Sequence, residues 1–181
     1  MRVTAVRHIT NIALIGFMGT GKSTVGRLVA EQLNFDLLDT DVLIEERSGK
    51  KITEIFAKNG EAAFRQLEAQ LVEELSKRTR VIISTGGGLP TNPANLTSLK
   101  AHSLVVCLWA SPEHIFERVR DQSHRPLLND PHPLEKIRTL LAAREQFYKQ
   151  ADVLLNSDLR SAREVAQQVI NQFRLVTQIR K

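Results

Sequence analysis

Short apolar runs that alternate with amphipathic stretches restrict the fold of this chain more than any other feature. Each run is too short for a helix and ends in turn-forming or polar residues, as buried strands do. Amphipathic stretches, in which apolar residues recur at helical spacing, separate or follow the runs. They include 24–33, 64–75 and the tail from residue 161. The runs that we expect to form strands are NIALIG (11–16), FDLLD (35–39), VIIS (81–84), SLVVCLW (103–109) and DVLL (152–155).

This alternation predicts the fold class. Strands that are apolar along their whole length are typical of a parallel sheet with helices on both faces. We therefore expect an α/β protein with three layers (α/β/α) around a five-stranded parallel sheet. The 181 residues suffice for a single domain (1–181) with a full core, which we expect to span 11–172. Residues 91–102 are expected to lie on the surface.

One segment breaks the pattern. Residues 121–133 (DQSHRPLLNDPHP) contain three prolines and show no periodicity. A connection of this length inside a compact domain is commonly a lid or a binding loop. A surface excursion is the alternative, but Arg125 before a proline and the apolar pair at 127–128 favour a mobile lid over about 121–133.

Composition excludes several classes of protein. No apolar run approaches the roughly 20 residues of a membrane helix, and the basic start lacks the apolar core of an export signal. Cys107 is the only cysteine and lies in an apolar run, which excludes disulfides and a thiolate zinc site and predicts a core thiol. The net charge of +5 comes without a basic run, so we expect small anionic ligands and no nucleic acid. We expect a cytoplasmic monomer without membrane contact.

A glycine-rich motif follows the first expected strand. Gly16, Gly21, Lys22 and Ser23 satisfy the pattern G-x-x-x-x-G-K-[ST] between a strand and a helix, the context that gives the pattern its meaning. Backbone N–H groups of such a loop face phosphate oxygens at the positive start of the helix. Lys22 would reach the β- and γ-phosphates, and the Ser23 hydroxyl would serve Mg²⁺. The motif predicts binding of a nucleoside triphosphate.

Two aspartates follow the second expected strand. Asp39 ends the run FDLLD, and Asp41 comes two residues later. Because residues two apart in an extended segment share a side, we expect both carboxylates in the crevice at the carboxyl edge of the sheet. One would serve the metal and the other a substrate hydroxyl. Capping of the following helix explains one aspartate but not both.

Arg65 has a carboxylate on each side at helical spacing, Glu61 four residues before it and Glu68 three after it. Surface ion pairing is the ordinary explanation of such spacing. However, the adjoining Phe64 and Leu67 indicate that this helix face packs against the core. A clamped arginine near the core is suited to binding an anion with its planar fork.

The motifs together resemble those of the shikimate kinase family. GFMGTGKST, DTD, GEAAFRQLE, STGGG, RPLL and the arginine and tyrosine of AREQFYKQAD appear in the order of that family, over roughly 11–172. The resemblance implies a P-loop kinase fold and Mg²⁺-dependent use of ATP. The implied reaction phosphorylates the 3-hydroxyl of shikimate to give shikimate 3-phosphate, in aromatic amino-acid (chorismate) biosynthesis.

The resemblance also implies roles for individual residues. Those implied to bind ATP are Gly19, Thr20, Gly21, Lys22, Ser23, Thr24, Arg118, Arg125 and Arg160. Those implied to bind shikimate are Asp41, Arg65, Gly86, Gly87, Gly88 and Arg144. Ser23 and Asp39 are implied to serve Mg²⁺. Lys22, Asp41 and Arg125 are implied to be catalytic: Lys22 and Arg125 would stabilise the transferred phosphoryl group, and Asp41 would orient the acceptor alcohol or also accept its proton.

The three consecutive glycines at 86–88 then have an interpretation. They end an expected central strand and have no lysine for phosphate. A backbone without Cβ atoms can approach a small polyhydroxylated ring and offer it N–H groups. A plain turn is the alternative, but it does not require three glycines.

Two other kinds of function remain open on the residues alone. The first is a kinase for another small acceptor, such as gluconate, whose carboxylate would also suit the arginines, or a nucleoside monophosphate, whose base would need recognition residues that we do not find. The second is a regulatory nucleotide-binding module without turnover. The joint presence of Lys22, Ser23, Asp41, Arg65 and Arg125 argues against the second.

Overall fold

The structure is a computed structural model, and it describes residues 7–120 and 130–178. Its five strands are β1 (Asn11–Ile15), β2 (Asp36–Asp39), β3 (Val81–Ser84), β4 (Ser103–Trp109) and β5 (Val153–Asn156). Its helices are α1 (Lys22–Leu33), α2 (Thr40–Ser48), α3 (Ile52–Leu75), the 3₁₀ turn η1 (Leu89–Thr91), α4 (Pro93–His102), α5 (Pro112–Val119), α6 (Pro133–Tyr148) and α7 (Ala162–Gln178).

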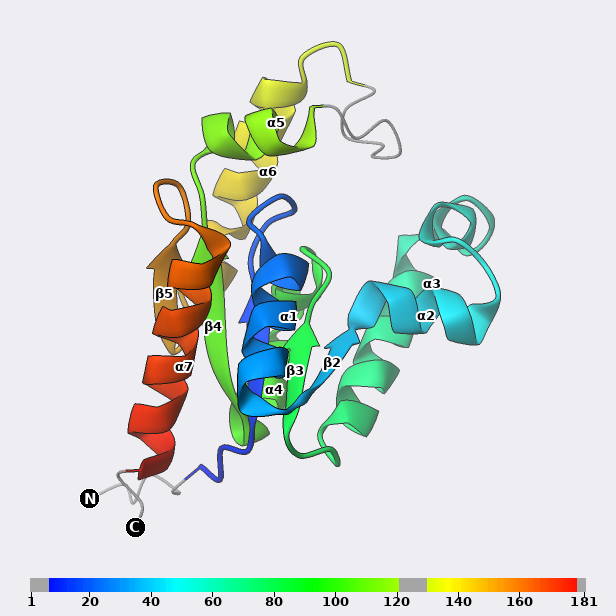
Figure 1. Ribbon diagram of the computed structural model, residues 1–181. Helices are drawn as coiled ribbons and strands as arrows, with labels where there is room; N and C mark the ends of the chain where they lie inside the picture. Colours follow the sequence, from blue (N-terminus) through cyan, green and yellow to red (C-terminus); the bar gives the residue numbers. More distant parts are fainter. Residues whose placement is uncertain (1–6, 121–129, 179–181) are drawn as a thin grey trace, which may run out of the picture.

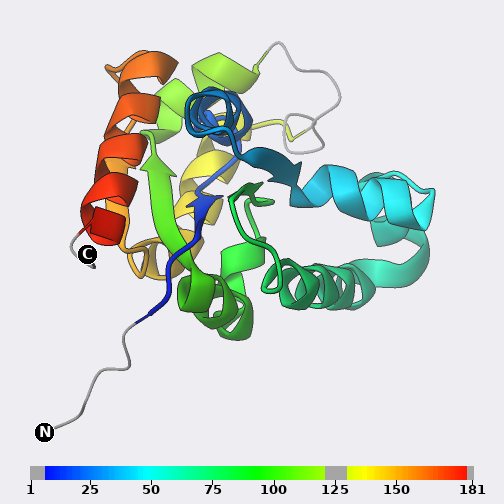
Figure 2. The same cartoon turned by 60° about the horizontal axis from the view of Figure 1, so that its bottom comes forward.

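The strands form one parallel sheet in the order β2-β3-β1-β4-β5. All five runs expected to form strands do so, with ends displaced by one residue at most. Figure 1 shows α1 and α7 in front of the sheet and α4 behind it, so the expected three layers are confirmed. Figure 2 shows α2 and α3 beyond the β2 edge, on the side of the sheet away from α7.

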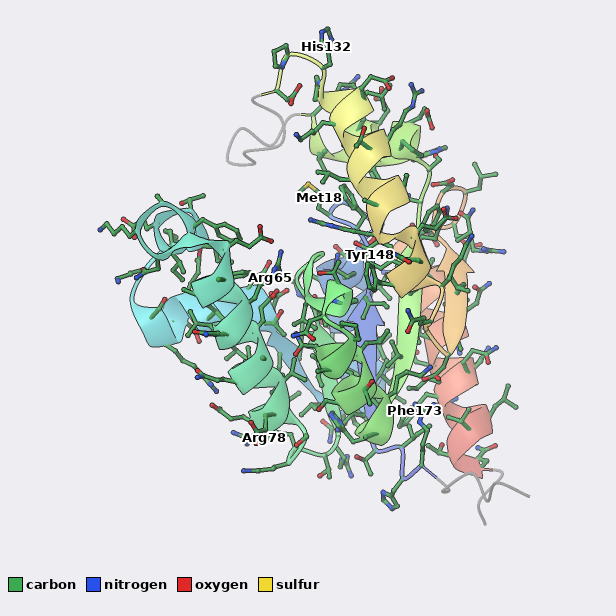
Figure 3. The ribbon with its side chains drawn as sticks, turned by 180° about the vertical axis from the view of Figure 1, so that it is seen from behind. Met18, Arg65, Arg78, His132, Tyr148 and Phe173 are labelled. Carbon is green, nitrogen blue, oxygen red and sulfur yellow. The ribbon has the colours of Figure 1, made fainter. Side chains whose placement is uncertain are left out.

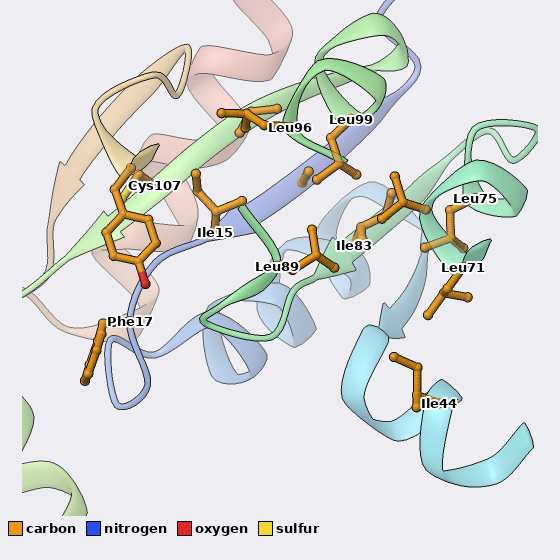
Figure 4. Packing of buried hydrophobic residues seen from close by; sticks show 14 of the residues in the cluster. Ile15, Phe17, Ile44, Leu71, Leu75, Ile83, Leu89, Leu96, Leu99 and Cys107 are labelled. Carbon is orange, nitrogen blue, oxygen red and sulfur yellow. The ribbon is translucent and has the colours of Figure 1, made fainter. Parts of the chain in front are cut away.

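Alternation along the central strand explains why the apolar runs are continuous. Ile12 and Leu14 pack with α1 and α7, whereas Ala13 and Ile15 belong to the core on the opposite face. Both faces are covered, so each of these four residues is fully buried. Figure 4 shows Ile15 of β1 and Cys107 of β4 in the core on the face opposite α1 and α7. Burial raises the pKa of the Cys107 thiol to about 12, which confirms the expected core thiol.

Two helices differ from expectation. The expected helix over 64–75 is the second part of α3, whose first part begins at Ile52 and is separated from it by Gly60, with a φ of 78°. The expectation that residues 91–102 lie on the surface is wrong for the inner side of α4. Leu96 and Leu99 are 2% and 0% exposed because α4 covers one face of the sheet and packs against α3.

Two further expectations are tested only in part. The lid expected over about 121–133 falls mainly on residues 121–129, which lie outside the described residues. Over the described ranges 7–120 and 130–178, no helix combines the length and apolar character needed to cross a membrane.

The segments that follow β1, β2 and β3 all leave the sheet at its carboxyl edge. The loops after β1 and β3 carry the glycine-rich motif and the three glycines, and the two aspartates stand where β2 passes directly into α2. The chain goes from β3 across β1 to β4, so β1 stands where the strand order changes direction. In open parallel sheets such a point is where ligands bind.

A buried polar cluster lies at the opposite, amino edge of the sheet. The side-chain amide of Asn11 accepts a hydrogen bond from the Val81 N–H (3.1 Å) through its oxygen, which fixes its nitrogen as the donor toward His102. That nitrogen lies 2.9 Å from His102 Nδ1, so Nδ1 accepts and the ring proton sits on Nε2. His102 is 9% exposed, and burial lowers its pKa.

This cluster predicts a loss of stability in mild acid. The unfolded chain protonates His102 near pH 6.5, whereas the folded chain resists protonation, so the stabilisation is complete above pH 6.5 and falls below it. The slope is at most about 1.4 kcal/mol per pH unit. Thermal melts at pH 7.5 and 5.5 should show a larger decrease in Tm for the wild type than for His102→Gln; equal decreases would contradict the assignment.

Candidate active site

A cleft of about 660 Å³ opens at the carboxyl edge of the sheet. Figure 3 shows Met18, Arg65 and Tyr148 at this end of the molecule, with Arg78 and Phe173 at the other. Every site residue expected from the sequence lines this cleft except Arg125, which lies outside the described residues. The residues concerned are Gly19, Thr20, Gly21, Lys22, Ser23, Thr24, Asp39, Asp41, Arg65, Gly86, Gly87, Gly88, Arg118, Arg144 and Arg160.

The loop after β1 turns directly into α1. Gly21 has a φ of 95°, a conformation that favours glycine, and Lys22 is the first residue of the helix. The Lys22 ammonium donates to the carbonyl oxygens of Gly16 (2.9 Å) and Phe17 (2.8 Å). The Thr20 hydroxyl donates to the Phe17 carbonyl (2.8 Å), so its proton is already engaged within the loop. The loop therefore surrounds the start of a helix, which is a favourable site for phosphate.

Three oxygen-bearing side chains meet at the first turn of α1. The Ser23 hydroxyl donates to Asp39 Oδ2 (3.1 Å), and the buried Ser84 hydroxyl donates to the same oxygen (3.0 Å). Ser84 is aligned with Asp39 in the β2–β3 pairing. Mg²⁺ in phosphate-binding sites takes one or two protein oxygens and completes its shell with water and phosphate. The hydroxyl and carboxylate here fit that requirement, although the described residues contain no cluster of three metal-binding side chains.

Asp41 reaches the cleft by a route that the sequence does not predict. The segment is not extended: Asp39 is the N-cap of α2, its Oδ1 accepts from the Asp41 N–H (3.1 Å), and Asp41 lies in the first helical turn. Both carboxylates line the cleft, as expected, but by capping geometry rather than by strand alternation. A Cβ atom on Gly86 would lie 2.4 Å from Asp41 Oδ1, so the carboxylate occupies space that only glycine leaves.

Arg65 is held by carboxylates on two sides. Glu61 accepts from Nε (3.2 Å) and Nη2 (2.8 Å), and Glu68 accepts from Nη1 (2.7 Å). Burial opposes the charge of Arg65, but these hydrogen bonds outweigh it and raise the guanidinium pKa further above its ordinary value. A guanidinium has five N–H groups. Two of them therefore remain for a ligand.

The glycine loop faces this arginine. A Cβ atom on Gly88 would lie 2.7 Å from both Nη atoms of Arg65 and 3.0 Å from Cζ, so the end of the guanidinium points at residue 88. At Gly87 a Cβ atom would make only ordinary contacts of 3.5 Å, among them one with Arg144 Nη1. The missing Cβ atoms of Gly86 and Gly88 thus admit the side chains of Asp41 and Arg65. The approach of a ligand ring to this loop stays a prediction.

Hydrogen bonds from the surrounding structure engage most of the backbone polar groups of residues 86–88. Gly86 N–H donates to Thr40 Oγ1 (2.9 Å), and the carbonyl oxygens of all three glycines accept hydrogen bonds. Among the described residues, no acceptor is found for the N–H groups of Gly87 and Gly88. Both glycines line the cleft, so these two N–H groups are available to an anion or a hydroxyl.

Glu68 contributes more than the sequence predicts. It is 1% exposed and lines the cleft, and its Oε1 has no hydrogen-bond partner among the described residues. Burial raises the pKa of Glu68 against the opposing effect of Arg65, and the nearby Asp41 carboxylate raises it further. The sequence indicates the ion pair with Arg65 but gives no signal of this burial, which arises from the tertiary packing of α3 against α2 and α4.

Arg144 approaches the same loop from α6. Its guanidinium lies over the ring of the buried Phe17, 5.5 Å from the centroid, a cation–π geometry. The pKa of the neighbouring Tyr148, four residues later, rises to about 12 because the phenol is buried. No carboxylate pairs with Arg144 within the described part of the chain. Arg65 and Arg144 thus place two guanidinium groups beside the glycine loop, next to Gly88 and Gly87, an arrangement that would suit an anion.

Two arginines occupy the other end of the cleft. Arg118 of α5 donates to Ser157 Oγ (3.1 Å) and to the Gly19 carbonyl (3.4 Å). Arg160 donates to the Asn156 carbonyl (2.8 Å) in the connection from β5 to α7. Both lie beside the loop after β1 and away from the pair Arg65 and Arg144. The cleft is also lined by residues that the sequence does not predict to lie there: Met18, Ile52, Phe56, Ser84 and Ser157.

The geometry permits a defined chemistry. A glycine-rich loop suited to phosphate and two arginines suited to an organic anion line one cleft, and Asp41, Gly87 and Gly88 line it too. Transfer of a phosphoryl group requires positioning and neutralisation of charge more than covalent catalysis. The arrangement is therefore suited to phosphoryl transfer onto a hydroxyl of a small acid.

Comparison with known proteins points to one family. A family model described as shikimate kinase matches residues 18–174. A shikimate kinase from Thermodesulfovibrio yellowstonii is 42% identical over 163 residues, which cover 90% of this chain and 94% of the relative. One from Caldicellulosiruptor saccharolyticus is 44% identical over 161 residues, or 89% and 94% of the two chains.

A solved structure is similar as well. It is described as shikimate kinase from Acinetobacter baumannii in complex with shikimate, and it matches with a TM-score of 0.86 at 36% identity over 97% of each chain. The match agrees with the three-layer architecture around a parallel five-stranded sheet, and the expected P-loop kinase fold is confirmed.

The contact at Gly88 gives a testable prediction. In Gly88→Ala the new methyl group would overlap the Arg65 guanidinium, which must move because it is the flexible end of a side chain. We expect Tm to change little and a crystal structure to show Arg65 displaced from Glu68. Gly87→Ala is the matched control, since its contacts are ordinary. An unmoved Arg65 in Gly88→Ala would contradict this account.

Proposed function

Because the chain belongs to the shikimate kinase family, we propose that the cleft at the carboxyl edge of the sheet binds ATP and shikimate side by side, with the residue roles given below. The chain is a phosphotransferase of the shikimate pathway: it uses ATP to phosphorylate the 3-hydroxyl of shikimate and gives shikimate 3-phosphate. The observation that carries the proposal is the grip of Arg65 and Arg144 in the same cleft as the loop around Lys22.

At the nucleotide end, the loop over residues 19–24 binds the ATP phosphates. This role is supported by the helix start at Lys22 and by the loop N–H groups that surround it. When ATP binds, the Lys22 ammonium exchanges its hydrogen bonds to the loop carbonyls for contacts that neutralise charge on the transferred phosphoryl group. Arg118 and Arg160 line the part of the cleft next to the loop and contact the rest of the nucleotide.

Mg²⁺ is the metal that this site suits. Ser23 would hold it directly and Asp39 directly or through water, which their shared hydrogen bond supports. The ion, when bound, supplies positive charge at the phosphate oxygens. Ser84 keeps Asp39 oriented toward Ser23 by its hydrogen bond to Oδ2.

At the acceptor end, Arg65 and Arg144 bind the shikimate carboxylate. Glu61 and Glu68 hold Arg65 before the substrate arrives, so little side-chain entropy is lost on binding. The free N–H groups of Gly87 and Gly88 add donors on the same side. Together these contacts orient the ring for reaction.

Asp41 binds the reacting hydroxyl. It lies against Gly86 and lines the same cleft as Lys22 and Arg65. Asp41 orients the hydroxyl for in-line attack on the γ-phosphorus of ATP, and the hydroxyl proton passes to its carboxylate as the new P–O bond forms and the bond to ADP breaks. The role of Arg125 in this transfer stays a prediction.

We further propose that the protein acts in the cytoplasm, where its co-substrate ATP is made. Its monomeric state stays a prediction.

The carboxylate grip predicts a selective loss of acceptor affinity. Arg65→Ala and Arg144→Ala should each raise the KM for shikimate about 10- to 100-fold, the range expected for losing about 1.5–3 kcal/mol of hydrogen bonding to a charged group. The KM for ATP should stay within about twofold, well below that loss. Steady-state kinetics test this, with Arg138→Ala, an exposed arginine of α6 outside the cleft, as control. An unchanged shikimate KM in both variants would refute the grip.

Lys22 should act on turnover instead. Lys22→Met keeps the aliphatic stem and removes the ammonium, and we expect kcat to fall about 100-fold or more, as when a donor to transition-state charge is lost. The shikimate KM should change little, because Lys22 lies at the nucleotide end. A variant that kept its kcat would show that Lys22 does not serve the transferred group.

One assay separates the proposal from its rivals. ATP consumption is measured with shikimate, with gluconate, with a nucleoside monophosphate and with no acceptor. We expect turnover with shikimate only. Preference for gluconate or a nucleotide would indicate another kinase, and the absence of turnover with every acceptor would indicate a regulatory module.

A further inference from the structure

Tyr148 is the only tyrosine of the chain, and its side chain is completely buried. It ends α6, and its hydroxyl donates a 2.7 Å hydrogen bond to the carbonyl oxygen of Gly87. Since burial raises its pKa to about 12, the phenol keeps its proton at neutral pH and remains a donor. A hydroxyl from a helix thus holds the middle residue of the glycine loop.

This hydrogen bond fixes the direction of one peptide group. No peptide bond among the described residues is cis. In a trans peptide the carbonyl and the following N–H point in opposite directions. The Gly87 carbonyl points to Tyr148, so the Gly88 N–H points away from α6. Gly88 is the residue that the Arg65 guanidinium faces.

The other carbonyls of the loop do not depend on α6. Gly86 accepts from Leu89 N–H (3.1 Å), and Gly88 accepts from both the N–H (3.0 Å) and the hydroxyl (2.7 Å) of Thr91. The Gly87 carbonyl has the Tyr148 hydroxyl as its one donor among the described residues. Because consecutive glycines resist rotation least of all residues, this peptide requires an external hydrogen bond to keep its orientation.

Tyr148 also lies next to the second arginine of the grip. Arg144 precedes it by four residues on α6, so both side chains lie on the same face of the helix. A Cβ atom on Gly87 would lie 3.5 Å from Arg144 Nη1. One helix turn therefore supplies both a cation for the acceptor and the hydroxyl that holds the loop beside it.

We propose that Tyr148 is a positioning residue for the acceptor: its hydroxyl holds the Gly87 carbonyl so that the Gly88 N–H joins Arg65 and Arg144 in binding the shikimate carboxylate. The inference rests on the proposed function and adds a residue to it. Tyr148 touches neither substrate. It acts through the peptide between Gly87 and Gly88.

Tyr148→Phe tests the proposal, because it removes the hydroxyl and keeps the ring that fills the core. We expect the shikimate KM to rise about three- to tenfold, as for one lost hydrogen bond, with little change in the KM for ATP. The second substrate is a shikimate analogue whose carboxylate is replaced by a hydroxymethyl group. For this analogue we expect equal kcat/KM in wild type and variant, since the positioned donor has no carboxylate to bind.

Thr177→Val is the matched control. It removes a hydroxyl that donates to the carbonyls of Phe173 (2.8 Å) and Arg174 (3.2 Å) in α7, far from the cleft. Both variants lose one hydroxyl that donates to backbone carbonyl oxygen, and both Tm values are measured. A general loss of stability would affect the two enzymes alike, whereas the proposal requires a higher shikimate KM in Tyr148→Phe alone.

Each remaining outcome overturns the inference. An unchanged shikimate KM in Tyr148→Phe would show that the loop keeps its orientation without the hydroxyl. An equal loss with shikimate and with the analogue would show that the hydroxyl does not act on the carboxylate. Failure of the proposed function is distinguishable, because the wild type itself would then not phosphorylate shikimate.

Discussion

Parallel pairing between β1 and β3 is the constraint on which the site depends. Leu14 of β1 is aligned with Ser84 of β3, so the two glycine loops leave neighbouring strands at the same level. A Cβ atom on Gly87 would lie 3.5 Å from both the Gly16 carbonyl oxygen and the Met18 nitrogen, which shows how closely the loops approach. The sheet thereby determines the distance between a phosphate donor and its acceptor, and the loops need only supply the chemical groups.

Charge in the cleft is arranged at a cost to stability. Glu68 is buried with one oxygen unpartnered among the described residues, which is unfavourable for folding. The same carboxylate helps to hold the Arg65 guanidinium in one orientation, because Glu61 and Glu68 together accept from three of its N–H groups. A cleft without Glu68 would hold Arg65 through Glu61 alone. Such local conflict between stability and order is expected at functional sites.

The sequence predicts the sheet well because strands buried on both faces have a simple signature, the continuous apolar run. It also predicts which residues gather in the cleft, because three motifs follow three strands whose carboxyl ends share an edge. It does not predict how they meet. Gly86 and Gly88 are glycines because side chains from α2 and α3 occupy the space of their Cβ atoms, and such contacts depend on tertiary packing. Asp41 enters the cleft through a helical turn, although strand alternation predicts the same side.

The inner side of α4 and the role of Tyr148 escape prediction for a related reason. The apolar residues of α4 are too few for a helical pattern to stand out, and the sheet face that they cover is known only from the fold. For Tyr148 the sequence shows an aromatic residue four positions after Arg144, which is ordinary for a core helix. Only the fold brings the Gly87 carbonyl within hydrogen-bond distance of its hydroxyl.

The strand β2, which ends at Asp39 and leads directly into the helix that carries Asp41, is at the edge of the sheet and pairs with β3 alone. It is also the strand whose residues are the least buried among β1, β2 and β3. Edge elements with few buried contacts open more readily than central ones. Fraying of β2 would carry Asp39 away from Ser23 and Asp41 away from Gly86 while the central strands stay paired. Local unfolding of this edge strand would therefore abolish activity under conditions in which the rest of the fold is still intact.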